Sequence, residues 1–141
     1  MGCPTVVSMV SDAEDRDEYQ PLSLASLGRL LVGAHDDRRW RLVAEFLEEY
    51  RWEPVDTRMA LLRDEPAPVG DEHWDVLLAA LAEHLAAQAG RAAPRWADSR
   101  ALRRLWFPFN SRAARVDALV NAPAAFRKRG IYVARQELEI A

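Results

Sequence analysis

The stretch DEHWDVLLAALAEHLAAQAG, residues 71–90, decides the fold of this 141-residue chain. Its large apolar side chains recur at the three- and four-residue spacing that places them on one face of an α-helix: Trp74, Leu77, Leu78, Leu81 and Leu85. Asp71 precedes this run and Gly90 follows it, and these residue types favour the two ends of a helix. The pattern predicts a central core helix from Asp71 to Ala89.

Upstream of this helix, the same spacing predicts three shorter ones. Ser23 is placed to cap a helix that carries four leucines and stops near Gly33. Residues 36–50 repeat apolar side chains on one face, with Arg38 and Arg39 at outer positions. After Pro54, Asp56 or Thr57 is expected to cap a third helix, and residues 63–70 read as a loop because they contain two prolines and a glycine.

Downstream of residue 90 the predicted elements are short. Asp98 is expected to cap a helix that continues through Leu105, and further helices are expected over residues 111–121, 124–128 and 135–140. Residues 131–133 suggest one short extended stretch. The chain is therefore predicted to be all-α, a compact bundle of about five to seven short and medium helices.

The composition is consistent with one folded domain preceded by an acidic tail. Half of the residues are hydrophobic, which is enough for one core in a chain of this length. Residues 1–20 hold five acids and one base and lack hydrophobic periodicity. They are predicted to be a disordered acidic tail, with a single helical domain over residues 21–141.

The sequence also excludes several kinds of site. Cys3 is the only cysteine, so an internal disulfide and a thiolate metal cluster are both excluded. There is no Gly-rich phosphate loop, GxSxG elbow or HExxH pair. No apolar run is long enough to span a bilayer, and the first ten residues lack a basic start typical of a signal peptide. We expect a cytoplasmic protein that is not an enzyme, with no catalytic residue, metal or cofactor.

Charge is segregated along the chain. Residues 36–90 hold thirteen acids against six arginines, a net of −7, whereas residues 91–129 hold ten bases against two acids, a net of +8. Aromatic residues interrupt the basic segment. Such a segment fits a nucleic acid, an acidic protein surface, or the rim of its own core facing the acidic half. The candidate partner-binding residues are Arg103, Arg104, Trp106, Phe107, Arg112, Arg115, Arg127, Lys128 and Arg129.

Several stretches occur in an order that resembles a known domain. These are residues 74–85, 93–96 (Ala-Pro-Arg-Trp), 105–108 (Leu-Trp-Phe-Pro) and 118–119, then 123–133 (Pro-Ala-Ala-Phe-Arg-Lys-Arg-Gly-Ile-Tyr-Val), with Trp40, Phe46 and the loop 64–70 upstream. The order resembles an actinobacterial C-terminal domain that follows a helix-turn-helix module in proteins encoded beside AbiEii-type nucleotidyltransferase toxins. The resemblance spans about residues 38–139, and the helix-turn-helix module itself is missing from this chain.

The resemblance implies an antitoxin or toxin regulator. Its cognate partner would be a nucleotidyltransferase-like toxin encoded by the adjacent gene, bound and neutralised through the basic and aromatic C-terminal surface. The alternative is a transcriptional regulator that binds nucleic acid with the same basic patch. Because the helix-turn-helix is missing, regulation by DNA binding is in doubt for this chain. An enzyme with an unrecognised site is a third hypothesis.

Overall fold

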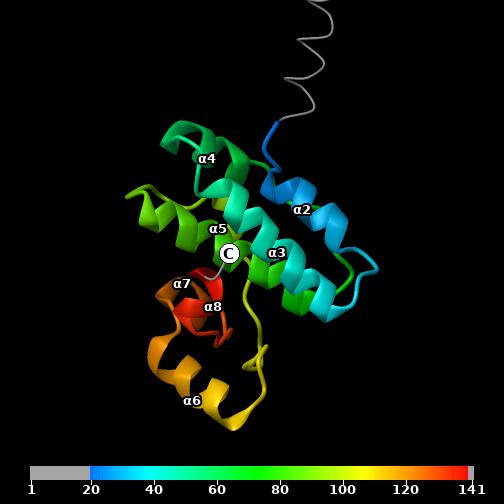
Figure 1. The fold of residues 1–141 in the computed structure, drawn as a ribbon, viewed down its shortest axis with the longest axis vertical. Helices are drawn as coiled ribbons and strands as arrows, with labels where there is room; N and C mark the ends of the chain where they lie inside the picture. Colours follow the sequence, from blue (N-terminus) through cyan, green and yellow to red (C-terminus); the bar gives the residue numbers. More distant parts are fainter. Residues whose placement is uncertain (1–19, 140–141) are drawn as a thin grey trace, which may run out of the picture.

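A computed structural model describes residues 20–139 of the chain (Figure 1). The expected acidic tail falls almost wholly outside the described residues, as does the end of the last expected helix. Within the described part there are seven α-helices, a 3₁₀ turn and no strand, which confirms the all-α prediction. The helices are α2 (Leu24–Leu31), α3 (Asp36–Tyr50), α4 (Val55–Arg63), α5 (Glu72–Gln88), α6 (Arg112–Asn121), α7 (Ala124–Arg127) and α8 (Arg135–Glu139), with η1 at Arg95–Ala97.

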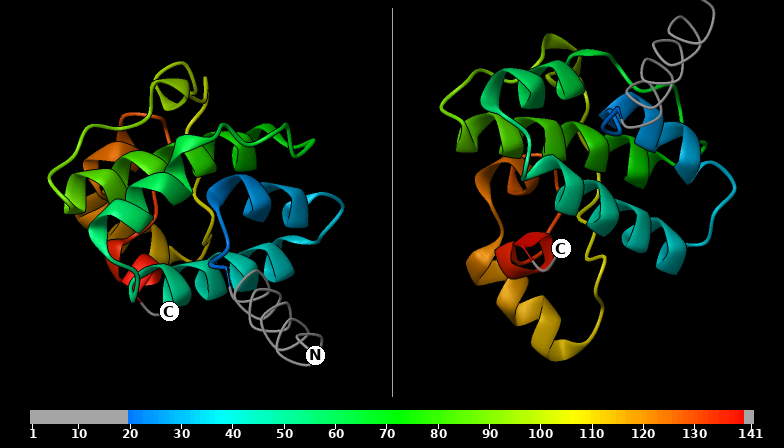
Figure 2. Two further views of the ribbon diagram at one scale, coloured as in Figure 1. Left: turned by 90° about the horizontal axis from the view of Figure 1, so that it is seen from above. Right: turned by 45° about the horizontal axis from the view of Figure 1, so that its top comes forward.

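The central helix is α5, as its sequence predicts. Ten of its residues are buried, from Trp74 to Ala86, and they occupy most of its circumference. A helix that is apolar on nearly all sides needs neighbours on nearly all sides. Helix α5 packs against α2, η1 and α7, and the views in Figure 2 show it passing through the middle of the bundle.

The helix ends follow local chemistry at most positions. The side chains of Ser23, Asp71 and Ser111 accept hydrogen bonds from the first turns of α2, α5 and α6. The prediction that Asp56 or Thr57 caps α4 is wrong, because the helix already begins at Val55 and Pro54 occupies the cap position without a side-chain bond. Pro54 fixes an extended backbone there, which starts the helix without a polar cap.

The helix expected from Asp98 to Leu105 is not formed. The structure has only the turn η1 in this region, and the chain then follows an irregular path, with a bend at residues 103–104, beside the segment that follows α7. Leu102 N–H donates to Arg129 O at 2.9 Å, and Trp106 N–H donates to Gly130 O at 2.8 Å. These bonds use the amide groups that a local helix would need. The extended stretch expected at 131–133 amounts to one isolated parallel bridge between Trp106 and Ile131.

The contact between residues 102–106 and residues 129–131, called the crossing below, depends on a glycine. Gly130 has φ +86°, a conformation that side chains with a Cβ rarely adopt, and a Cβ at this position would lie 3.4–3.6 Å from Leu102 and Arg104 atoms. The crossing fixes the path of residues 102–111, which lead to α6. As Figure 1 shows, α6 lies at one end of the bundle, beyond α7 and α8.

None of the helices among residues 20–139 has both the length and the hydropathy that a membrane-spanning helix needs.

Candidate binding surface

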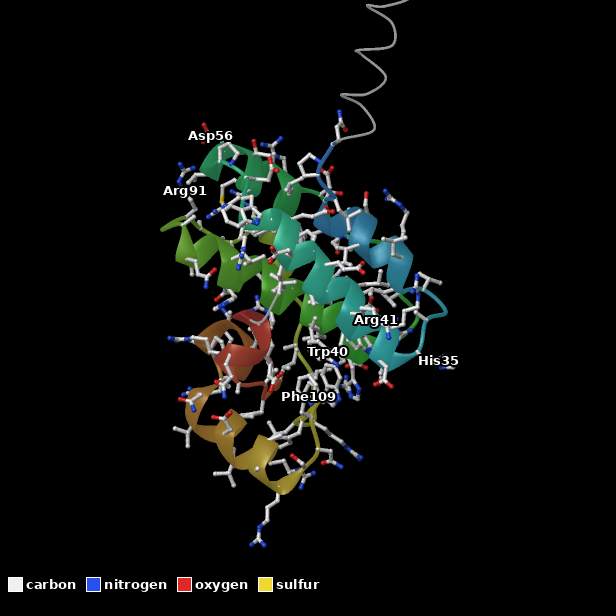
Figure 3. The ribbon with its side chains drawn as sticks, in the orientation of Figure 1. His35, Trp40, Arg41, Asp56, Arg91 and Phe109 are labelled. Atoms are coloured by element: carbon white, nitrogen blue, oxygen red, sulfur yellow. The ribbon has the colours of Figure 1, made fainter. Side chains whose placement is uncertain are left out.

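Four of the ten bases in residues 91–129 are ion-paired with the acidic half of the chain. The pairs are Arg91 with Asp56 (3.8 Å), Arg100 with Glu65 (2.9 Å), and Lys128 and Arg129 with Glu83 (2.7 and 3.0 Å). Figure 3 shows the first of them, which connects α4 to the end of α5. Part of the basic segment therefore stabilises the fold by pairing with the acidic half of the same chain. This is the third of the three interpretations given above for the charge segregation.

Arg129 is the clearest example and does not belong to the candidate surface. It is 2% exposed, and its guanidinium donates to Ala125 O and Ala97 O as well as pairing with Glu83. Burial alone would raise the pKa of Glu83, but the hydrogen bonds and charges of Lys128 and Arg129 outweigh it, so the pKa is lowered. Arg129 is a structural cation that ties α7 to α5 and η1.

Trp106 is also part of the scaffold. Its ring stacks on His73, with centroids 4.5 Å apart, and meets the edge of Trp74 at 5.8 Å. The cluster continues through Trp40, which contacts both Trp74 and Phe109 at 5.0 Å. In Figure 3, Trp40 and Phe109 face each other across the gap between α3 and the segment before α6. These rings attach the segment 106–109 to the core.

Phe107 is half-buried and links this segment to the last part of the chain. Its ring stacks on Tyr132 at 5.3 Å, and the guanidinium of Arg115 lies 5.1 Å from the Phe107 centroid. The Arg115 charge itself is exposed. The Phe107 ring therefore packs against one face of the Arg115 guanidinium, and the rest of the Arg115 side chain is exposed to solvent.

The exposed arginines are divided between two places. Arg103 and Arg104 line a hollow together with Asp71, Glu72 and His73, so acids lie beside their charges. Arg112 and Arg115 stand on α6, and Arg127 lines a different hollow next to it. Within the described part of the chain none of these five arginines forms an ion pair. The structure thus brings Arg112, Arg115 and Arg127 to one end of the bundle and places Arg103 and Arg104 apart from them.

Helix α6 carries an apolar stripe that no other element of residues 20–139 covers. Only Ala118 of its ten residues is buried, whereas Val116, Leu119 and Val120 are 58%, 54% and 70% exposed. At about 3.6 residues per turn these three side chains fall on one side of the helix, opposite Ala118, and Arg112 and Arg115 flank them.

The stripe continues into a polar hollow. Val120 lines it together with Arg127, Arg135 and Gln136, and its volume is about 310 Å³. Arg127 also donates to Ala122 O at 2.8 Å, which holds its side chain against the backbone after α6. We call the combined area the α6 surface; its residues are Arg112, Arg115, Val116, Leu119, Val120, Arg127 and Arg135.

Three arginines of the α6 surface, Arg112, Arg115 and Arg127, are predicted from the sequence, whereas Arg135 and the apolar part of the surface are not. The signal was present, since Val116, Leu119 and Val120 have helical spacing. A stripe of this kind ordinarily faces the core, so spacing alone does not distinguish a covered face from an exposed one. The distinction comes from the position of α6 at the end of the bundle.

Among residues 20–139, no group of three or more acidic, histidine or cysteine side chains is arranged to hold a metal ion. No protein-family model, curated protein sequence or solved structure matches this chain. A functional proposal for this chain must therefore rest on its own surface, and the α6 surface combines exposed apolar side chains with arginines that are unpaired within the described residues.

Proposed function

We propose that this protein binds another protein through the α6 surface and acts as an antitoxin-like neutraliser in the cytoplasm. The observation that carries the proposal is the exposed stripe of Val116, Leu119 and Val120 bordered by arginines. Apolar side chains next to each other on a surface favour association, because covering them removes apolar area from water. Arginine is enriched in protein interfaces, where its planar guanidinium pairs with carboxylates.

A protein partner fits these residues better than a nucleic acid does. Single-stranded nucleic acids bind to proteins through exposed rings on which bases stack. In this chain Trp106 and Phe107 are engaged with His73, Trp74 and Tyr132. The side chains at the centre of the α6 surface are aliphatic and offer no stacking platform.

The chemistry of the α6 surface indicates an acidic partner. Arg112, Arg115, Arg127 and Arg135 surround the stripe, and none of them has an acidic partner within the described residues. A matching surface would place apolar side chains opposite Val116 and Leu119 and carboxylates around them. Nucleotidyltransferase active sites carry metal-binding carboxylates. The toxin implied by the sequence resemblance is thus our proposed partner, covered and inactivated by α6.

The proposal expects the adjacent gene to encode a nucleotidyltransferase-like toxin, and the experiment is co-expression of this chain with that gene product. The wild-type chain should co-purify with the enzyme and relieve its toxicity. Leu119→Asp should abolish both effects, because it places a carboxylate in the centre of the stripe. Leu30→Asp is the matched control: Leu30 is 49% exposed on α2, away from α6.

If Leu119→Asp and Leu30→Asp behave alike, α6 is not the contact. If the wild-type chain instead binds nucleic acid, with an affinity that falls steeply with salt, the regulator alternative is correct.

A further inference from the structure

Trp52 is the most exposed large apolar side chain among residues 20–139. It lies in the short connection between α3 and α4, and it is 72% exposed. Its ring is nevertheless held in place, because the Arg51 guanidinium carbon lies 4.8 Å from the ring centroid and the indole Nε1–H donates to Glu48 Oε1 at 3.4 Å. A rigid, exposed tryptophan loses little side-chain entropy on binding, and tryptophan is enriched among the residues that anchor protein interfaces.

Acidic residues flank Trp52 in the sequence. Residues 45–56 hold five acids and one base, a net of −4. Glu49 and Glu53 form no ion pair within the described residues. Val55, three positions after Trp52, adds a second apolar side chain that is 41% exposed. We call this area the Trp52 surface; its residues are Glu48, Glu49, Trp52, Glu53, Val55 and Asp56.

The Trp52 surface and the α6 surface are opposite in charge, and both contain exposed apolar side chains. They also lie at opposite ends of the molecule: in Figure 1, where the longest axis is vertical, α4 is at the top and α6 at the bottom, and Figure 3 labels Asp56 at the α4 end. Contact between two α6 surfaces would bring arginines together, and contact between two Trp52 surfaces would bring carboxylates together. Like charges disfavour both of these symmetric pairings.

We propose that this chain self-associates head to tail, with the α6 surface of one copy on the Trp52 surface of the next. This contact pairs arginines with carboxylates and removes both apolar areas from water. A heterologous contact leaves one surface of each kind free at the ends of an assembly, so further copies can add. The self-association uses the same α6 surface as the proposed function and therefore competes with the toxin, but it requires no other protein.

Sedimentation velocity of the purified full chain tests the proposal. The average mass of the wild-type chain should rise with protein concentration up to about 1 mM and fall when salt is added, because salt screens exposed charges. Trp52→Ser and Leu119→Asp each lack one of the two surfaces, and each should remain monomeric. An equimolar mixture of these two variants should form a dimer that does not grow, because each variant carries the surface that the other lacks.

Leu30→Ser is the matched control, since it removes an exposed apolar side chain of α2 that belongs to neither surface. It should self-associate as the wild type does. Circular dichroism checks that both interface variants keep their helices. A wild-type chain that stays monomeric, a Trp52→Ser chain that still assembles, or two folded variants that do not combine on mixing would each overturn the proposal.

The experiment contains this chain alone, so its result is separate from that for the proposed function. A chain that assembles but does not bind the toxin contradicts only the proposed function. A chain that binds the toxin but stays monomeric contradicts only the self-association.

Discussion

Arg39 Nη1 lies 3.1 Å from Asp71 Oδ2, and this ion pair joins the start of α3 to the start of α5 across 32 positions of sequence. Arg39 is 8% exposed, although its position in the sequence suggested the outer side of α3. Its Nε also donates to Leu31 O at 3.0 Å, and its guanidinium lies over the Trp74 ring. One side chain thus connects α2, α3 and α5.

Replacing Arg39 should therefore destabilise the protein. Arg39→Met keeps the aliphatic stem but leaves Leu31 O and Asp71 without their donor, at a cost of about 2–3 kcal/mol in the free energy of unfolding. Arg38→Met, one residue away and exposed, should change it by less than about 0.5 kcal/mol. Urea unfolding of the two variants measures the difference, and equal stabilities would show that the buried pair has no structural role.

Glu83 should make stability depend on pH. Its pKa is lowered from the usual 4.5, because contacts with Lys128 and Arg129 outweigh the opposing effect of burial. A carboxyl group with a lowered pKa in the folded state stabilises the fold above its unfolded pKa. That contribution is lost as pH falls from about 4.5 through the folded pKa.

The comparison is between Glu83→Gln and wild type, with the unfolding free energy measured at several pH values. Glu83→Gln should be less stable at pH 7 and should lose less stability on acidification, so the two curves converge in acid. Glu45→Gln, on an exposed position of α3, should follow the wild-type curve. Parallel curves for Glu83→Gln and wild type would contradict the assignment.

Trp106 should behave as a structural residue. Trp106→Ala removes its ring contacts with His73 and Trp74, and we expect a loss of about 2 kcal/mol, less than for a fully buried tryptophan because Trp106 is half-buried. The neighbouring Leu105→Ala, on an exposed side chain, should have almost no effect. A Trp106→Ala variant with unchanged thermal stability but lost partner binding would place this ring in the interface instead.

Most of the helices could be predicted from local sequence, because their apolar spacing and terminal residues act within one or two turns. Helix α5, with Asp71 at its start and Gly90 (φ +69°) after its end, shows this most plainly. The segment 98–105 could not be predicted in this way. Its path depends on hydrogen bonds from Leu102 to Arg129 and from Trp106 to Gly130, 27 and 24 positions later in the sequence, and no local pattern encodes them.

The candidate site, too, could be predicted only in part from local sequence. The charges of Arg112 and Arg115 are visible in the sequence, but burial of Arg129 depends on carbonyl groups of Ala97 and Ala125 that converge only in the folded chain. Exposure of Val116 and Leu119 likewise depends on where α6 packs. The sequence predicts the charges and the helical spacing of these side chains, and tertiary packing decides which of them face outward.

The arginines of α6 should govern how fast the partner binds. Arg112→Gln combined with Arg115→Gln should slow association by about two- to tenfold and flatten its salt dependence, because exposed charges mainly steer the encounter. Arg95→Gln, an exposed arginine on η1, serves as the charge control. Stopped-flow measurements of the association rate at several salt concentrations compare the double variant with wild type and with Arg95→Gln. An unchanged rate in the double variant would remove these two charges from the interface.

The most direct measurement is the dissociation constant of this chain with the proposed partner, a nucleotidyltransferase-like toxin expected from the adjacent gene, for wild type, Leu119→Asp and Leu30→Asp. We expect wild type and Leu30→Asp to bind with similar affinity. Leu119→Asp should bind at least about a hundredfold more weakly, as for loss of an interface anchor. No binding by the wild-type chain, or equal affinity in all three, would contradict the proposal that α6 holds the toxin.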